Sequence, residues 1–160
     1  MTSQEWIRKR LRERAELRGK SRVVADGIDD LWRNLWSAVK TLLETYVTAY
    51  QYEAVDWSAY APEIVSATVR EGALTAIGDS PTPIRRGERK LIWKLDRTKA
   101  TVVATYQNCG ATPQRTFTIG VNSAGQATFQ NANSEPITVE DVAQTMVDSL
   151  LFPDLMGNAP

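Results

Sequence analysis

The sequence predicts an α+β protein in which a long N-terminal helix and a C-terminal helix pack on one face of a four- or five-stranded antiparallel meander sheet. Three observations support this fold class. Apolar residues recur every three or four positions between residues 24 and 49, apolar and polar residues alternate in short segments between residues 66 and 130, and a second helical pattern follows residue 138. A chain of 160 residues, 42% of them hydrophobic, is large and apolar enough for one such domain.

The first helix is predicted from residue 23 to about residue 52. Two neighbouring apolar stripes run along it and form a face wider than the seam of a two-stranded coiled coil. This helix would be about 45 Å long, which exceeds the width of a small domain. We therefore expect that it bends, or that part of its apolar face projects toward a second chain. The stripes consist of Val24, Ile28, Leu31, Leu35, Ala38, Leu42 and Ala49, and of Trp32, Trp36, Val39, Leu43, Tyr46 and Tyr50.

The residues after this helix change to an alternating pattern, which is typical of strands. Residues 53–62 lose the helical periodicity and end in Pro62, so the helix ends before them. Short, turn-rich segments separate the strand candidates that follow, and they favour successive hairpins with one solvated face. These candidates are residues 66–70 and 73–77 around Gly72, and residues 90–96, 100–107, 115–121 and 126–130.

The C-terminal helix begins after Thr138. Thr138 followed three residues later by Asp141 resembles a capping box, and acidic residues are favourable at this end of a helix. Pro153 marks the end of the helix. Its apolar stripe consists of Val139, Val142, Met146 and Leu150.

The chain contains no histidine, and this absence excludes several kinds of catalytic site. It removes Ser-His-Asp and Cys-His nucleophile systems and the commonest ligand of zinc. The sequence has no phosphate-binding loop, dinucleotide-binding glycine pattern or zinc-ligand spacing. We therefore expect a protein that is not an enzyme and that holds no cofactor and no metal ion. The carboxylates left for acid–base chemistry are scattered over strand ends and loops: Glu63, Glu71, Asp79 and Glu88.

A group of three aspartates within one helical turn offers oxygen atoms to a hard cation. These residues lack the backbone carbonyl ligands that a glycine-containing loop supplies, and negative charge early in a helix is favourable without any metal. We expect no metal site at Asp26, Asp29 and Asp30.

The single Cys109 cannot form an internal disulfide, which favours a reducing compartment. It precedes Gly110 in a predicted hairpin loop without a basic neighbour to lower its pKa, so we expect an unreactive thiol. The sequence shows neither the apolar core of a signal peptide nor a run long enough to span a membrane. We expect a cytoplasmic protein.

Residues 1–22 form a basic arm, which we expect to be helical, in front of a single α+β domain at residues 23–160. The arm holds eight Lys or Arg residues against three Glu, a net charge of +5, so the rest of this neutral chain carries −5. This pattern fits phosphate contacts, an acidic protein partner, or an exposed helix that folds back on its own domain or on a neighbouring subunit. The predicted partner-binding residues are Arg8, Lys9, Arg10, Arg12, Arg14, Arg18, Leu31, Trp32, Leu35 and Trp36.

A second basic cluster occupies a loop rich in Pro and Gly ahead of the strand candidate at residues 90–96. Two glycines give this loop conformational freedom, and its charge suits an anion. The predicted anion-binding residues are Arg85, Arg86, Arg89 and Lys90.

We therefore expect a non-enzymatic interaction or structural protein that self-associates, with a dimer favoured, and binds a macromolecular partner through its N-terminal helix and basic arm. One alternative is a nucleic-acid-binding module that uses the arm and the loop at residues 85–90. Another is a small-molecule-binding domain with a cavity between helix and sheet. Nucleic-acid binding measured at two salt concentrations distinguishes the first alternative from the others, because phosphate-driven affinity falls steeply as salt rises.

Overall fold

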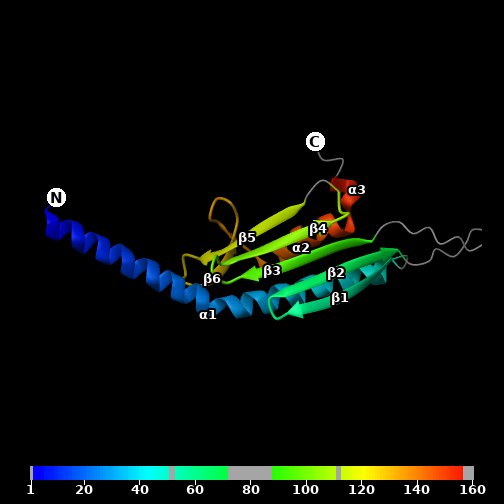
Figure 1. Ribbon diagram of the computed structural model, residues 1–160, viewed down its shortest axis with the longest axis horizontal. Helices are drawn as coiled ribbons and strands as arrows, with labels where there is room; N and C mark the ends of the chain where they lie inside the picture. Colours follow the sequence, from blue (N-terminus) through cyan, green and yellow to red (C-terminus); the bar gives the residue numbers. More distant parts are fainter. Residues whose placement is uncertain (1, 51–52, 72–87, 111–112, 157–160) are drawn as a thin grey trace, which may run out of the picture.

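The computed structural model describes residues 2–50, 53–71, 88–110 and 113–156. It confirms the α+β class, with a long N-terminal helix, a C-terminal helix and an antiparallel sheet (Figure 1). The elements in chain order are α1 (Ser3–Ala49), β1 (Glu53–Ala61), β2 (Ile64–Glu71), β3 (Arg89–Asp96), β4 (Thr101–Gln107), β5 (Gln114–Val121), β6 (Ala127–Gln130), β7 (Pro136–Ile137), α2 (Val139–Leu151) and α3 (Pro153–Met156).

The sheet contains seven strands in the order of the chain, with every neighbouring pair antiparallel. It is thus a meander, with more strands than the four or five that we predicted. The additional strands are the edges β1 and β7. The inward face of β1 begins with the buried Glu53, so its pattern does not read as an apolar alternation. The strand predicted at residues 73–77 lies outside the described residues.

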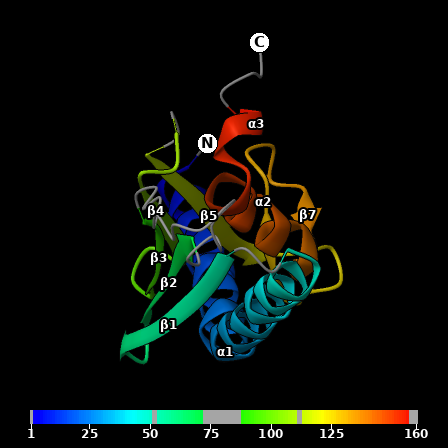
Figure 2. The ribbon, with the colours of Figure 1, turned by 90° about the vertical axis from the view of Figure 1, so that its right-hand side faces the viewer.

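Helices α1 and α2 lie side by side against the same face of the sheet, as the view along α1 shows (Figure 2). Helix α1 contacts β1, β5 and β6, whereas α2 contacts β3 and β4. The core between these layers draws on all three parts of the fold. Its largest fully buried members are Leu35, Val39 and Leu43 of α1, Val69, Leu91, Trp93, Leu95, Val102 and Phe129 of the sheet, and Val142, Met146 and Leu150 of α2.

Helix α1 is one continuous helix of 47 residues, about 70 Å long at 1.5 Å per residue. It begins at Ser3 rather than near residue 23, because Thr2 and Glu5 form a complete capping box: the Glu5 amide donates to Thr2 Oγ1 and the Thr2 amide donates to Glu5 Oε2. Residues 2–22 are exposed throughout, and this part of α1 extends beyond the sheet (Figure 1). The helix length that exceeds the domain therefore lies at its N-terminal end.

A close approach fixes where α1 crosses the sheet. Gly27 of α1 faces Ala127 of β6, and a Cβ atom on Gly27 would lie 2.6 Å from the Ala127 Cβ. Nearby, Trp32 donates from its indole Nε1 to the Pro62 carbonyl at 2.9 Å, which ties α1 to the turn between β1 and β2. These contacts mark the point where the projecting part of α1 ends and the packed part begins.

Candidate functional site

The arm, residues 2–22 of α1, is the described part of the chain with the most exposed large apolar side chains. Trp6, Ile7, Leu11 and Leu17 are 54%, 49%, 52% and 66% exposed. At 100° per residue Trp6, Ile7 and Leu17 lie on the side of α1 that carries the core residues, such as Leu35, whereas Leu11 lies at the edge of that side, at the same angle as Asp29. The apolar face by which α1 packs on the sheet thus continues along the arm, where no part of the described chain covers it.

The predicted basic residues of the arm are all at the surface. Arg10 forms an exposed ion pair with Glu13 at 3.0 Å, and its guanidinium lies 6.0 Å from the centre of the Trp6 ring. Exposed pairs of this kind contribute little to stability, so they leave the arm free to exchange them for contacts with a partner. The predicted partner-binding residues Arg8, Lys9, Arg10, Arg12, Arg14 and Arg18 are all exposed, as are Lys20 and Arg22.

The four apolar residues that we predicted for partner binding lie in or beside the core. Leu35 is 0% exposed and Trp32 is 9% exposed, while Leu31 and Trp36 are half-buried and pack against the core cluster. They hold α1 on the sheet of their own chain, so the docking surface proposed below does not include them. The exposed apolar residues of the arm were not among the predicted partner-binding residues, although Ile7 and Leu11 have helical spacing in the sequence.

Of the second basic cluster, Arg85 and Arg86 lie outside the described residues. Arg89 and Lys90 lie in two different environments. The Arg89 side chain is largely removed from solvent, where it pairs with Glu53 at 2.9 Å and donates through Nε to the Leu150 carbonyl at 2.7 Å. Lys90 lies on the outer face of the sheet, where its Nζ donates to the Tyr60 hydroxyl at 3.2 Å. In the described part of the chain these two cations do not face one site.

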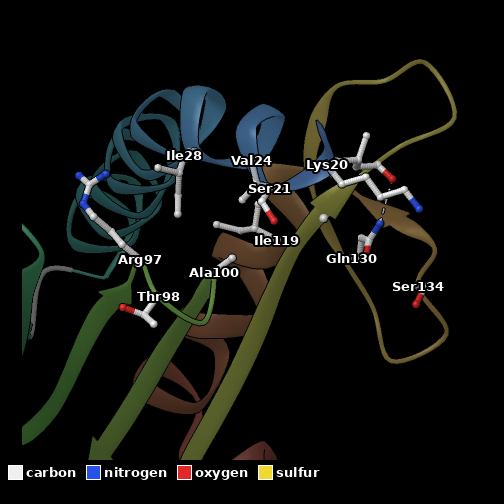
Figure 3. Close-up of a pocket in the computed structure, with 13 residues that line it drawn as sticks. Lys20, Ser21, Val24, Ile28, Arg97, Thr98, Ala100, Ile119, Gln130 and Ser134 are labelled. Carbon is white, nitrogen blue, oxygen red and sulfur yellow. Dashed lines mark hydrogen bonds between the residues drawn. The ribbon is translucent and has the colours of Figure 1, made fainter. Parts of the chain in front are cut away.

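A pocket of about 660 Å³ lies where the arm joins the body (Figure 3). Val24 and Ile28 of α1 and Ile119 of β5 form its apolar wall, and Lys20 and Gln130 lie on its rim. Beside it Arg97 forms ion pairs with Asp29 and Glu63, which raise its pKa and join α1 to the turns after β1 and β3. The pocket therefore has a fixed wall on the body side and the root of the arm on the other.

Among the remaining candidates for chemistry, Cys109, Asp29 and Asp30 make structural contacts. Cys109 is buried, its Sγ donates to the Gln107 carbonyl at 3.1 Å, and burial raises the pKa of its thiol. Asp29 pairs with Arg97 and Asp30 with Arg33, and the described residues contain no group of His, Cys, Asp or Glu that would hold a metal ion.

We found no match to this chain among protein-family models, curated proteins or solved structures. Within the described part of the chain, no helix is long and apolar enough to cross a membrane. The arm and the pocket at its root are thus the two surfaces from which a function can be argued.

Proposed function

We propose that this protein is a non-enzymatic, self-associating docking protein that meets its macromolecular partner through its N-terminal arm. The observation that carries this proposal is that the arm stands free of the body with both apolar and basic side chains exposed. A helix of about 20 residues without tertiary contacts is only marginally stable in water. Contact with a partner stabilises the arm and removes the ring of Trp6 and the side chain of Leu17 from water.

The charge distribution supports a second copy of the chain as one of these partners. The arm carries +5 and residues 23–160 carry −5, so the arm of one chain is attracted to the body of another. The whole chain is neutral, and therefore no long-range repulsion opposes the approach of two copies.

Light scattering on the full chain and on a chain that lacks residues 1–22 tests this function. The core of α1 lies entirely after residue 22, so we expect the shortened chain to fold. At tens of micromolar we expect association for the full chain and a monomer for the shortened one. A full chain that stays monomeric at this concentration would contradict the proposal, as would equal association of both chains.

A nucleic-acid-binding module is a second candidate, favoured by the exposed Lys and Arg residues of the arm. If it is correct, affinity for a DNA or RNA duplex depends on the arm and falls by roughly 10³-fold or more between low and moderate salt. Weak binding that is unchanged by removal of residues 1–22 would contradict it.

The pocket at the root of the arm favours a small-molecule site as a third candidate, since its volume lies in the range of ligand pockets. Val24→Trp would fill it from the helix side, whereas Val23→Trp would place the same ring about 100° away around α1, at a residue that does not line the pocket. Binding of an apolar fluorescent dye that the first variant abolishes and the second retains would support this candidate. Equal binding by both would contradict it.

A further inference from the structure

The side of α1 that faces away from the core carries charges whose signs are reversed at positions equally far from one central residue. At 100° per residue, one third of the helix circumference contains eight charged residues between residues 5 and 33. All eight are exposed, including those in the part of α1 that packs on the sheet. We call this surface the outer face. Its members are Glu5, Arg8, Arg12, Ala15, Glu16, Gly19, Arg22, Val23, Asp26, Asp30 and Arg33.

The charges of the outer face are antisymmetric about Gly19: their signs run −, +, +, − before Gly19 and +, −, −, + after it, so each half is neutral. On this face, two charged residues that lie equally far before and after Gly19 always have charges of opposite sign. The same holds for Lys9 and Asp29 at its margins, and the like-charged Arg18 and Lys20 lie outside it. The matched pairs are Glu5 with Arg33, Arg8 with Asp30, Arg12 with Asp26, and Glu16 with Arg22.

We propose that two copies of this chain pair through the outer face, with their α1 helices antiparallel and a two-fold axis at Gly19. This inference rests on the proposed function, because it gives the geometry of the self-association. In such a pair, residues equally far from Gly19 lie at the same level, so Arg8 and Arg12 of one chain lie opposite Asp30 and Asp26 of the other. Two-fold symmetry repeats each pair, along an overlap of about 42 Å.

The residues at the proposed axis suit a close approach of two helices. Gly19 has no side chain, and Ala15 and Val23 flank it on the same face. A glycine destabilises a helix interior relative to alanine. Nothing lies within 4 Å of a Cβ atom built on Gly19, so packing within the chain does not require glycine there. A close contact with a second helix at this position would explain why residue 19 is a glycine.

Charge also selects the orientation. A parallel pair of α1 helices would place one +5 arm against the other, which repels. The antiparallel pair places each arm against the aspartates of the partner's body. The contact between Arg33 and Asp30 within one chain is an exposed pair at 3.3 Å, with side chains 73% and 75% exposed, so it is weak enough to be exchanged.

Two double variants with reversed charges test this pairing by sedimentation equilibrium of the full chain. Arg8→Asp/Arg12→Asp places acidic residues opposite acidic residues, and Asp26→Arg/Asp30→Arg places basic residues opposite basic residues. We expect each variant alone to weaken the dimer by about tenfold or more. An equal mixture of the two forms a mixed dimer, and a chain with all four changes regains its own dimer. Unchanged circular dichroism shows that the variants are folded.

A disulfide tests the position of the axis, in a Cys109→Ser background that removes the native thiol. Gly19→Cys places both thiols at the axis, so we expect mild oxidation to yield a covalent dimer. Ser37→Cys is the matched control, because Ser37 is exposed at the same angle around α1, five helical turns further on. In the proposed pair its two copies lie about 54 Å apart and do not join.

The outcomes separate this inference from the proposed function. Association that persists in both charge variants, or equal cross-linking at residues 19 and 37, would show that the chain self-associates by another surface. A full chain that is monomeric throughout would overturn both proposals. Recovery of the dimer in the four-fold variant, with cross-linking at residue 19 only, supports the antiparallel pair.

Discussion

Arg89 and Glu53 form an ion pair that is almost closed to solvent, with an Nη2–Oε2 distance of 2.9 Å and side chains 13% and 7% exposed. Through further hydrogen bonds this pair connects the sheet to both α1 and α2. Tyr46 of α1 donates its hydroxyl to the same Glu53 oxygen at 2.8 Å, and Arg89 donates through Nε to Leu150 of α2. Burial and this hydrogen bond raise the pKa of Tyr46, so its hydroxyl stays a donor.

Removal of one partner of this pair is expected to be strongly destabilising, because a buried carboxylate is left without its cation. Arg89→Met should lower the free energy of unfolding by about 3–5 kcal/mol, measured by urea denaturation. Arg89→Met/Glu53→Leu should recover part of this loss, since no charge remains buried. Arg10→Met is the matched control in an exposed pair and should change stability by less than about 0.5 kcal/mol.

Tyr106 should make the fold less stable at alkaline pH. Its hydroxyl donates to the Met146 carbonyl at 2.6 Å, and burial raises its pKa from 10.0 to about 12. The unfolded chain therefore loses this proton near pH 10, while the folded chain keeps it. The contribution to stability is complete below pH 10 and is lost as pH rises from 10 to 12, by about 2–3 kcal/mol.

Urea denaturation of Tyr106→Phe across this range checks the sign. The variant should be less stable than the parent chain at pH 7 by about 1 kcal/mol, and this difference should shrink above pH 10 and reverse in sign by about pH 12. Tyr60→Phe is the control, because Tyr60 is exposed and hydrogen bonds from Ser66 and Lys90 lower its pKa. A constant difference for Tyr106→Phe from pH 7 to pH 12 would contradict this assignment.

Gly27 and Gly19 both lie inside α1, and we expect opposite effects of alanine at the two positions. At Gly27 the new Cβ would lie 2.6 Å from the Ala127 Cβ, a short and rigid side chain, so α1 must move away from β6. Gly27→Ala should cost about 1–3 kcal/mol of unfolding free energy despite the better helix propensity. Within one chain the new Cβ of Gly19→Ala meets nothing, so the variant should lose no stability at concentrations where the chain is a monomer. Thermal and urea unfolding of both variants measure the difference.

Leu35 and Leu17 are the same residue type on the same side of α1, yet their truncation should differ. Leu35 is fully buried, and Leu35→Ala is expected to cost about 2–5 kcal/mol. Leu17 is 66% exposed, so Leu17→Ala should change the unfolding free energy by less than about 0.5 kcal/mol. Similar losses at both positions would show that the arm is buried in solution.

The fold class was predictable because each element shows its buried face in its own local pattern. The three-and-four spacing of α1 and the alternation in β3 to β6 indicated which side of each element packs inward, and the structure confirms this. Thr138 also caps α2 as expected, accepting from the Asp141 amide at 3.0 Å. Strand β1 was missed because its inward position is Glu53, whose burial depends on Arg89, 36 residues further on.

The candidate site was only partly predictable. The charge of the arm is a property of the sequence alone, and so is the antisymmetric pattern of charges about Gly19 on the outer face of α1. Spacing alone did not separate Trp32 and Leu35, which the sheet covers, from Leu11 and Leu17, which it leaves exposed. The sequence also did not show that Arg89 forms a largely buried ion pair with Glu53. We had predicted that Arg89 lies on an anion-binding loop.

The sequence by itself determined which residues share a face of α1 and how charge is divided along the chain, because both follow from the helical repeat and the residue types. Only the tertiary structure decided where the sheet ends beneath that helix. Burial is a property of two surfaces in contact, so an apolar stripe becomes core along the sheet and remains a docking surface beyond it. For this protein the change occurs between Leu17 and Ile28.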